Sequence, residues 1–236
     1  MQSDVDFLGM APGPGADRFR FTICGHLARL DGLLYGGTAI AAAMAAAEAV
    51  TGRSSLWTTT QFVATAGPGT EVTVTVEELA AGRRAAQVRV TGTDPTGRVL
   101  FASLGATGEA DMERPRGVFL DPPRVADPDD SPPWGGPIAT IVRLIADAEE
   151  SSGRPPGVGF MSVVELLEPE VVSHPDPGPG RLTYWARRVD GGPMTPAIVA
   201  YIADLVPLSV STAMGVVEVG TSLDNTIRVD PSVQTD

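Results

Sequence analysis

One nearly unbroken apolar run stands out in the first half of the chain, from position 39 to position 50, and only Glu48 within it is polar. Gly36 and Gly37 lie just before the run, as turn and helix-start residues often do, and Gly52 follows it where a helix commonly ends. The pattern predicts a helix that is apolar on every side and must therefore be covered on every side. It is too short for the roughly 20 apolar residues of a membrane span.

Alternating apolar and polar residues predict strands around this helix. Phe19 and Phe21 alternate with polar residues before it, and Val72, Val74 and Val76 alternate with threonines and glutamates after it. The predicted strands cover residues 19–24, 56–65, 71–77, 86–91 and 99–107. The first half is thus a strand, the helix and a four-stranded antiparallel meander. A sheet of this kind encloses an apolar helix by curling around it, which is the hotdog fold.

The second half repeats this pattern after a connector. Residues 108–157 are rich in proline, aspartate and glycine, and residues 138–149 have the apolar spacing of a short amphipathic helix. Strand-like runs at 158–167 and 181–189, a mostly apolar helix at about 196–211 and a strand at 221–229 follow. We therefore predict an α+β double hotdog, with an N-terminal hotdog at 1–107, the connector at 108–157 and a C-terminal hotdog at 158–236.

The two predicted copies are unequal in length. About 57 residues run from the end of the first helix at Val50 to the end of the first copy at Thr107, against 25 from Ser211 to Asp236. The C-terminal hotdog is therefore expected to be incomplete, with an open sheet edge. Either the natural chain is longer than these 236 residues or a partner covers the edge. The second possibility predicts a homodimer.

Composition narrows the classes of partner and compartment. The formal net charge is −12, from 29 acidic and 17 basic residues, which argues against binding to nucleic acid or to an anionic membrane surface. Cys24 is the single cysteine, so no disulfide within the chain and no multi-cysteine metal site is expected. The first residues lack the basic and apolar regions of a secretory signal. These features predict a cytoplasmic protein.

The chain resembles the TesB-like double-hotdog acyl-CoA thioesterases in four segments that occur in this order: YGGTAIAAAMAAAEAV, EELAAGRRAAQVRVTGTDPTGRVLFASLGA, VAYIADLVPLS and GTSLDNTIRV. The resemblance implies hydrolysis of a fatty acyl-CoA to free acid and CoA, and no metal or other cofactor is expected. In that family an Asp, a Ser or Thr and a Gln hold the attacking water. The matching positions are Asp204 and Ser222, whereas the Gln has no counterpart, since its strand would lie beyond Asp236.

The residues themselves point to compatible chemistry. A carboxylate within an apolar helix, as predicted for Asp204, needs a hydrogen-bond partner or a function, and activating water is such a function. Gly36 and Gly37 place backbone N–H groups at a helix start, where an oxyanion is stabilised. Gly36 and the preceding Tyr35 are assigned to substrate binding. Because the two central helices of a double hotdog can face each other, Gly37 and Asp204 are predicted to share one site.

Arg83, Arg84 and Arg187 are the predicted contacts for the CoA phosphates, with Arg188 beside them. Structural alternatives stay open for every one of these residues: solvated arginines in turns, a helix acid that faces solvent, a hydroxyl at a strand start and a glycine pair in a tight turn.

Two other functions are compatible with the same fold. A non-catalytic acyl-CoA binding protein is favoured if the natural chain ends without the Gln. A hotdog dehydratase or hydratase would use a histidine before the central helix and an acid on it, here His26 and Glu48, but Glu48 lies more than two turns from the helix start. The chain contains no G-x-S-x-G, P-loop or H-E-x-x-H motif.

Overall fold

A central helix, α2 (Gly36–Thr51), organises the fold, as the apolar run predicts. The computed structural model describes residues 3–109, 123–134, 159–169, 180–205, 207–214 and 221–229. Every residue of α2 from Gly37 to Ala47 is buried. Gly52 ends the helix in the left-handed conformation, with φ 65°, and donates its N–H to the Glu48 carbonyl oxygen at 2.8 Å.

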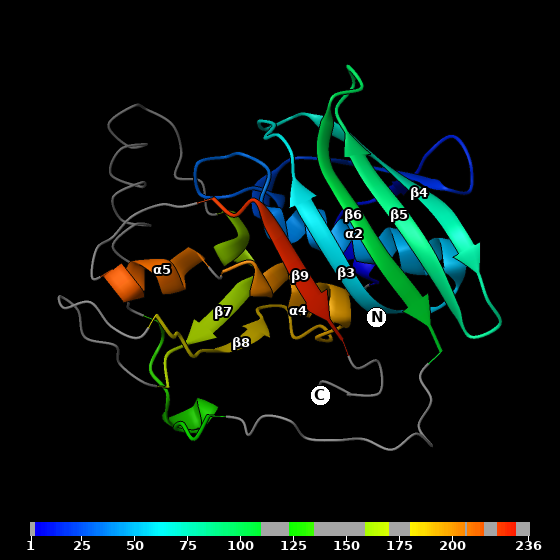
Figure 1. Ribbon diagram of the computed structural model, residues 1–236. Coiled ribbons are helices and arrows are strands. Elements are labelled where there is room, and N and C mark those ends of the chain that lie inside the picture. Colours follow the sequence, from blue (N-terminus) through cyan, green and yellow to red (C-terminus); the bar gives the residue numbers. More distant parts are fainter. Residues whose placement is uncertain are drawn as a thin grey trace.

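An antiparallel sheet of seven strands curls around α2 (Figure 1). The strand order is β1-β2-β4-β5-β6-β3-β9, and every neighbouring pair is antiparallel. The strands are β1 (Ala11–Pro12), β2 (Arg18–Thr22), β3 (Ser54–Phe62), β4 (Glu71–Ala81), β5 (Ala85–Thr93), β6 (Val99–Gly108) and β9 (Asp224–Arg228). Register shifts in β3 and β4 mark bulges, which increase the local twist and so help the sheet to curl.

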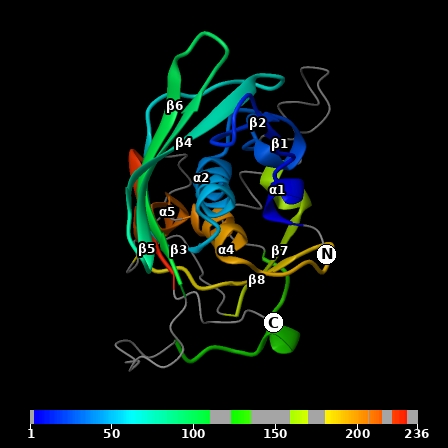
Figure 2. The ribbon, with the colours of Figure 1, turned by 90° about the vertical axis from the view of Figure 1, so that its right-hand side faces the viewer.

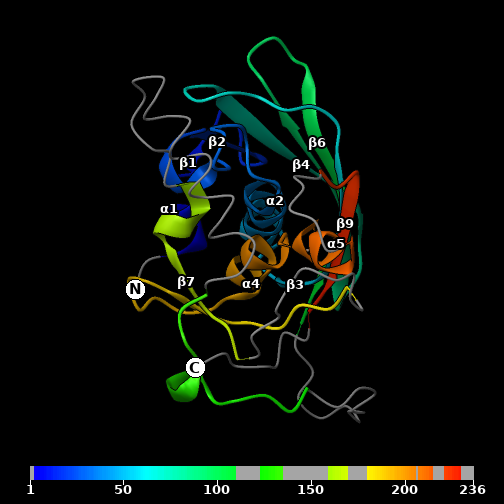
Figure 3. The same ribbon diagram turned by 90° about the vertical axis from the view of Figure 1, so that its left-hand side faces the viewer.

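The alternation read from the sequence places one face of each strand against α2. Val72, Val74 and Val76 of β4 are buried, as are Val88 and Val90 of β5, whereas the residues between them are more exposed. Figures 2 and 3 look along α2 from its two ends and show it between this sheet and α1 (Asp4–Phe7), with α4 (Pro196–Ala203) beside it.

The meander is confirmed for β4, β5 and β6 but not for β3. That strand pairs with β6, at the far side of the sheet from β4. Residues 63–70 connect β3 to β4, and they are too many for a tight hairpin, so the chain crosses the end of the helix before it returns to the sheet. Within this connection the Ala66 carbonyl accepts the Leu34 N–H at 2.9 Å, which fixes the crossing beside the start of α2.

The second half differs from the sequence prediction in its helix. Instead of one helix over 196–211, the structure has α4, which ends at Ala203, and α5 (Pro207–Met214). Proline lacks the N–H that a continuing helix needs and disfavours helical backbone in the residue before it, so Pro207 starts a new helix. Asp204 consequently lies at the C-terminal cap of α4 rather than within a helix.

The strands of the second half are also shorter than predicted. The run at 158–167 begins with a 3₁₀ turn, η3 (Gly159–Ser162), before β7 (Val164–Leu167), and the run at 181–189 contains only β8 (Trp185–Arg188). β7 and β8 form a separate two-stranded sheet, whereas β9 pairs with β3 and extends the first sheet. The remaining described elements are η1 (Gly25–Leu27) and η2 (Pro128–Asp130).

The predicted helix at 138–149 lies outside the described residues. No helix within the described ranges combines the length and the apolar character that crossing a membrane requires.

We expect Gly37→Ala to destabilise the protein by about 3 kcal/mol or more, because overpacking against rigid backbone forces helices apart. A Cβ at this position would collide with the Tyr201 carbonyl oxygen and would lie 2.8 Å from Tyr35 Cζ. Urea unfolding measures the change. Gly67→Ala is the matched control, since a Cβ there meets nothing within 4 Å. Equal stability of the two variants would contradict the close approach of α2 and α4.

Candidate active site

The start of α2 meets the end of α4, and Asp204 lies at this junction. A Cβ on Gly36 would overlap Asp204 Oδ2 and would lie 3.0 Å from Phe62 Cζ. The Gly37 backbone N–H donates a hydrogen bond to the Asp204 carboxylate. The two glycines therefore leave the space that the carboxylate occupies, and the structure brings Gly36, Gly37 and Asp204 together, as the shared-site prediction requires.

The electrostatics of the junction set the proton affinity of Asp204. Burial raises the pKa of the carboxyl from its ordinary value of 3.8 to about 6. Hydrogen bonds from Asn225 and from the Gly37 N–H lower the pKa, as does the positive charge of Arg29, but burial outweighs all three. The carboxylate is therefore mostly ionised at neutral pH and still basic enough to accept a proton there.

Asn225 is a site residue that sequence reasoning missed. Its Nδ2 donates to Asp204 Oδ1 at 3.3 Å, across 21 positions of the chain. In the sequence, Asp224 and Asn225 look like strand-start caps. The alternation of β9 was the available signal: Asn225 and Ile227 are half-buried on one face, and their neighbours are exposed. Pairing of Asn225 with Thr60 of β3 then carries its side chain to the helix junction.

Two tyrosines fix the junction. The Tyr35 hydroxyl donates to the Tyr201 carbonyl oxygen at 2.9 Å, and the Tyr201 hydroxyl donates to the His26 carbonyl oxygen at 2.5 Å. Both rings are buried, and they meet edge to face with centroids 5.1 Å apart. Tyr35 also stacks on Phe160 at 4.5 Å. Tyr35, predicted to bind substrate, thus has a structural contact that ties the start of α2 to α4.

Ser222 lies near the end of β3 that faces the junction. It is half-buried and directly precedes Leu223, whose carbonyl oxygen accepts the Phe62 N–H at 2.9 Å. Phe62 in turn faces Gly36. Among the described residues, Ser222 makes no hydrogen bond to Asp204.

The predicted phosphate contacts lie elsewhere. Arg83 and Arg84 occupy the turn between β4 and β5, where Arg53, just after α2, donates to the Arg83 carbonyl oxygen at 3.4 Å. They are thus at the opposite end of α2 from Asp204, about 24 Å away by helix length. Arg187 is exposed on β8, where it forms an ion pair with Glu165.

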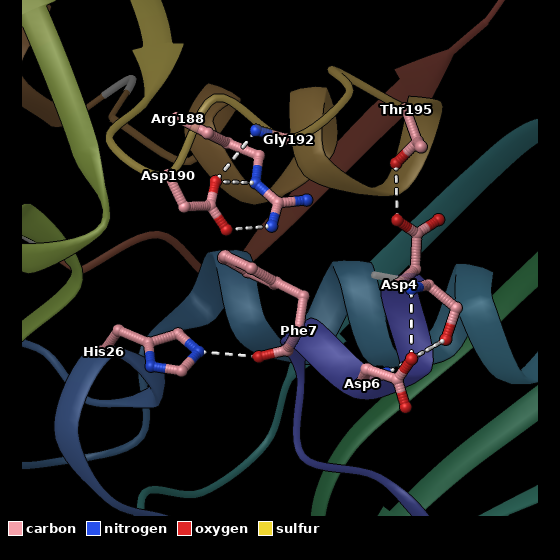
Figure 4. Close-up of polar contacts among 9 residues, drawn as sticks. Asp4, Asp6, Phe7, His26, Arg188, Asp190, Gly192 and Thr195 are labelled. Carbon is pink, nitrogen blue, oxygen red and sulfur yellow. Dashed lines mark hydrogen bonds and ion pairs between the residues drawn. The ribbon is translucent and has the colours of Figure 1, made fainter. Parts of the chain in front are cut away.

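The start of α4 provides a contrast with the start of α2 (Figure 4). Thr195 caps α4 by accepting the Ile198 N–H at 3.2 Å, and its hydroxyl donates to Asp4 Oδ1 at 2.8 Å. The buried Arg188 pairs with Asp190 and lies 4.8 Å over the Phe7 ring. Side chains of the chain itself thus fill this helix start, whereas Tyr35 gives α2 no side-chain cap.

His26 and Glu48, the pair of the dehydratase alternative, make separate contacts. His26 Nε2 lies 2.7 Å from the Phe7 carbonyl oxygen near the start of α2. Glu48, near the other end of that helix, accepts the Ser55 N–H at 2.8 Å. No three His, Cys, Asp or Glu side chains of the described residues come together as metal ligands would.

Comparison with known families places this junction in context. Residues 28–105 match the model of the acyl-CoA thioesterase N-terminal domain, and residues 122–233 match that of the C-terminal domain. The chain belongs to the acyl-CoA thioesterase family. The resemblance read from the sequence is thereby confirmed, and α2 and α4 fall in the N-terminal and C-terminal matches respectively. No curated protein sequence matches the chain.

Solved structures agree on the hotdog fold. A candidate thioesterase from Novosphingobium aromaticivorans is 28% identical with a TM-score of 0.76, and the match covers 93% of this chain and 79% of that chain. A hot dog protein of unknown function from Alicyclobacillus acidocaldarius is 18% identical with a TM-score of 0.75, and the match covers 97% of this chain and 79% of that chain. The tesB protein of Mycobacterium avium subs. paratuberculosis is 19% identical with a TM-score of 0.64, and the match covers 94% of this chain and 77% of that chain.

We expect Asp204→Asn to stabilise the protein at pH 8. Because the folded pKa lies above the unfolded one, the carboxyl costs stability that is absent below pH 3.8, grows as pH rises to about 6 and is constant above it. The Asn variant lacks this cost and should gain about 1–3 kcal/mol at pH 8 but little at pH 4. Urea unfolding at both pH values measures the gain.

Asp224→Asn is the control for this measurement, because Asp224 is exposed on β9. It should change stability by less than about 0.5 kcal/mol at either pH. A loss of stability in Asp204→Asn at pH 8 would show that the carboxylate is favourably placed in the fold rather than held at a cost.

Proposed function

We propose that this thioesterase hydrolyses a fatty acyl-CoA to the free acid and CoA, using a water molecule activated by Asp204. The observation that supports the proposal is the ionised carboxylate, with a pKa raised to about 6, held against the glycine start of a buried helix. A base and a set of backbone N–H donors thus occupy one place, which is what acyl transfer to water needs.

In this mechanism the water oxygen attacks the thioester carbonyl carbon while Asp204 accepts a proton from the water. The carbonyl oxygen becomes an oxyanion near the positive end of α2. The Gly37 N–H is already bonded to Asp204, which leaves the Gly36 N–H to stabilise the oxyanion. When the tetrahedral intermediate collapses, the C–S bond breaks, and the protonated Asp204 returns its proton to the CoA thiolate. Ser222, which lies beside the Phe62 end of β3, is assigned to holding the water.

The non-catalytic alternative makes the same site a receptor for acyl-CoA. The dehydratase alternative has less support, since His26 and Glu48 each contact another group.

A homodimer also remains our proposal: β9 has one neighbour in the described sheet, and an open edge favours pairing with another strand. Placement in the cytoplasm stays a prediction from the sequence.

We expect Asp204→Asn to lower kcat for acyl-CoA hydrolysis by about 10²- to 10⁴-fold, because the amide cannot accept the proton of the attacking water. Release of CoA thiol, followed with a thiol reagent over a series of acyl chain lengths, measures the rate. Asp224→Asn is the matched control and should keep the wild-type rate. Wild-type protein that binds acyl-CoA without releasing thiol would favour the binding alternative, and an active Asp204→Asn variant would exclude the proposed base.

We expect kcat/KM to rise with pH through an apparent pKa of about 6, as Asp204 loses its proton. Asn225→Ala removes a hydrogen bond that lowers this pKa, so the rise should move to higher pH. Thr226→Val, on the exposed face of β9, is the control and should leave the profile in place. A profile that is the same in Asn225→Ala and wild type would rule out Asn225 as a group that tunes the base.

A further inference from the structure

The proposed substrate carries several phosphate charges, and the chain that binds it is strongly acidic. With a net charge of −12, the protein as a whole repels a polyanion, so binding depends on a local cation. Arg83 and Arg84 lie at the far end of α2, and Arg187 is paired with Glu165 on β8. None of the three lies beside Asp204. Arg29, in the loop that leads into α2, is the arginine whose charge acts on Asp204.

Arg29 lies in the short loop that leads into α2. Ala28 and Leu34 form an isolated β-bridge across this loop, and the Arg29 N–H donates to the Leu33 carbonyl oxygen at 2.7 Å. The bond from the Leu34 N–H to Ala66 joins the loop to the connection after β3. The loop is therefore held beside the helix junction rather than projecting into solvent.

The guanidinium of Arg29 is positioned before any substrate binds. Its Nε donates to Asp31 Oδ1 at 3.1 Å, and its Nη2 donates to Asp31 Oδ2. The two side chains are 26% and 43% exposed, so the pair is solvated and weak. Nη1 is not used in this pair, and guanidinium is well matched to phosphate oxygens. Arg29 also lowers the pKa of Asp204, so its charge is felt at the proposed base.

We propose that Arg29 binds a phosphate of the CoA moiety and thereby selects CoA thioesters over thioesters that lack phosphate. This inference rests on the proposed function, since it assigns the carrier for the same site. Asp31 contacts the guanidinium through Nε and Nη2, and the loop holds Arg29 beside the start of α2.

The test compares one acyl group on CoA and on pantetheine, which has the same arm without the phosphates. For Arg29→Gln at pH 8, where Asp204 is ionised, KM for acyl-CoA should rise about 5- to 20-fold, as expected for loss of a charge-assisted bond. KM for acyl-pantetheine should rise much less, because no phosphate contact is involved. Any change in kcat should be the same for both substrates, because Arg29 also acts on the pKa of Asp204. Arg29→Lys, which keeps the charge but not the planar donors, should fall between wild type and Arg29→Gln.

Arg89→Gln is the matched control, because Arg89 also pairs with a carboxylate, that of Glu77, on the exposed face of the sheet. It should leave KM for both substrates unchanged. An equal rise of both KM values in Arg29→Gln, or no rise in either, would overturn the proposal. If Arg29→Gln does not fold, the ratio of the two KM values in Arg29→Lys decides in the same way.

Failure of the proposed function is distinguishable from failure of this inference. If wild-type protein hydrolyses neither thioester, the proposed function is wrong, and calorimetric titration with free CoA and free pantetheine then tests Arg29 alone. A preference for CoA that is present in wild type and lost in Arg29→Gln supports the inference. Equal affinities of wild type and Arg29→Gln for CoA exclude it.

Discussion

The close approach of the start of α2 to the end of α4 is the constraint on which the rest of the molecule depends. Two glycines permit it, because a Cβ on Gly36 would meet Asp204 and a Cβ on Gly37 would meet the Tyr201 backbone. The hydroxyl of Tyr35 then ties the two helices together. Once this contact is fixed, the curled sheet has a helix pair of defined geometry to cover, and the end of α4 delivers a carboxylate to the positive end of α2.

The start of α2 and the start of α4 serve different purposes, although an aspartate lies beside each of them. Each helix start has a carboxylate from elsewhere in the chain beside it, Asp204 at α2 and Asp4 at α4, and burial raises the pKa of both. At α4, Thr195 satisfies the helix and the aspartate together. At α2 the glycines offer only backbone N–H groups. A ligand can therefore compete for the start of α2, whereas the start of α4 is already satisfied.

Local rules predicted much of the fold. The apolar run defined α2, Gly52 marked its end, and alternation located the strands of the first sheet. The break after Ala203 also has a local cause, Pro207, but the apolar character of residues 196–211 favours the prediction of one continuous helix. What sequence reasoning could not supply were contacts set by distant pairing: β3 beside β6, and β9 beside β3, which carries Asn225 to Asp204.

The basicity of Asp204 follows from a balance that no single neighbour sets. Donors alone would stabilise the carboxylate and make it a weak base, whereas burial alone would raise its pKa further. Asn225, Gly37 and Arg29 offset part of the burial, which leaves the pKa at about 6. Of these three, Arg29 alone acts through a net charge that an anion can neutralise. A phosphate bound by Arg29 would therefore raise the proton affinity of Asp204, so the base would become stronger when CoA occupies the site.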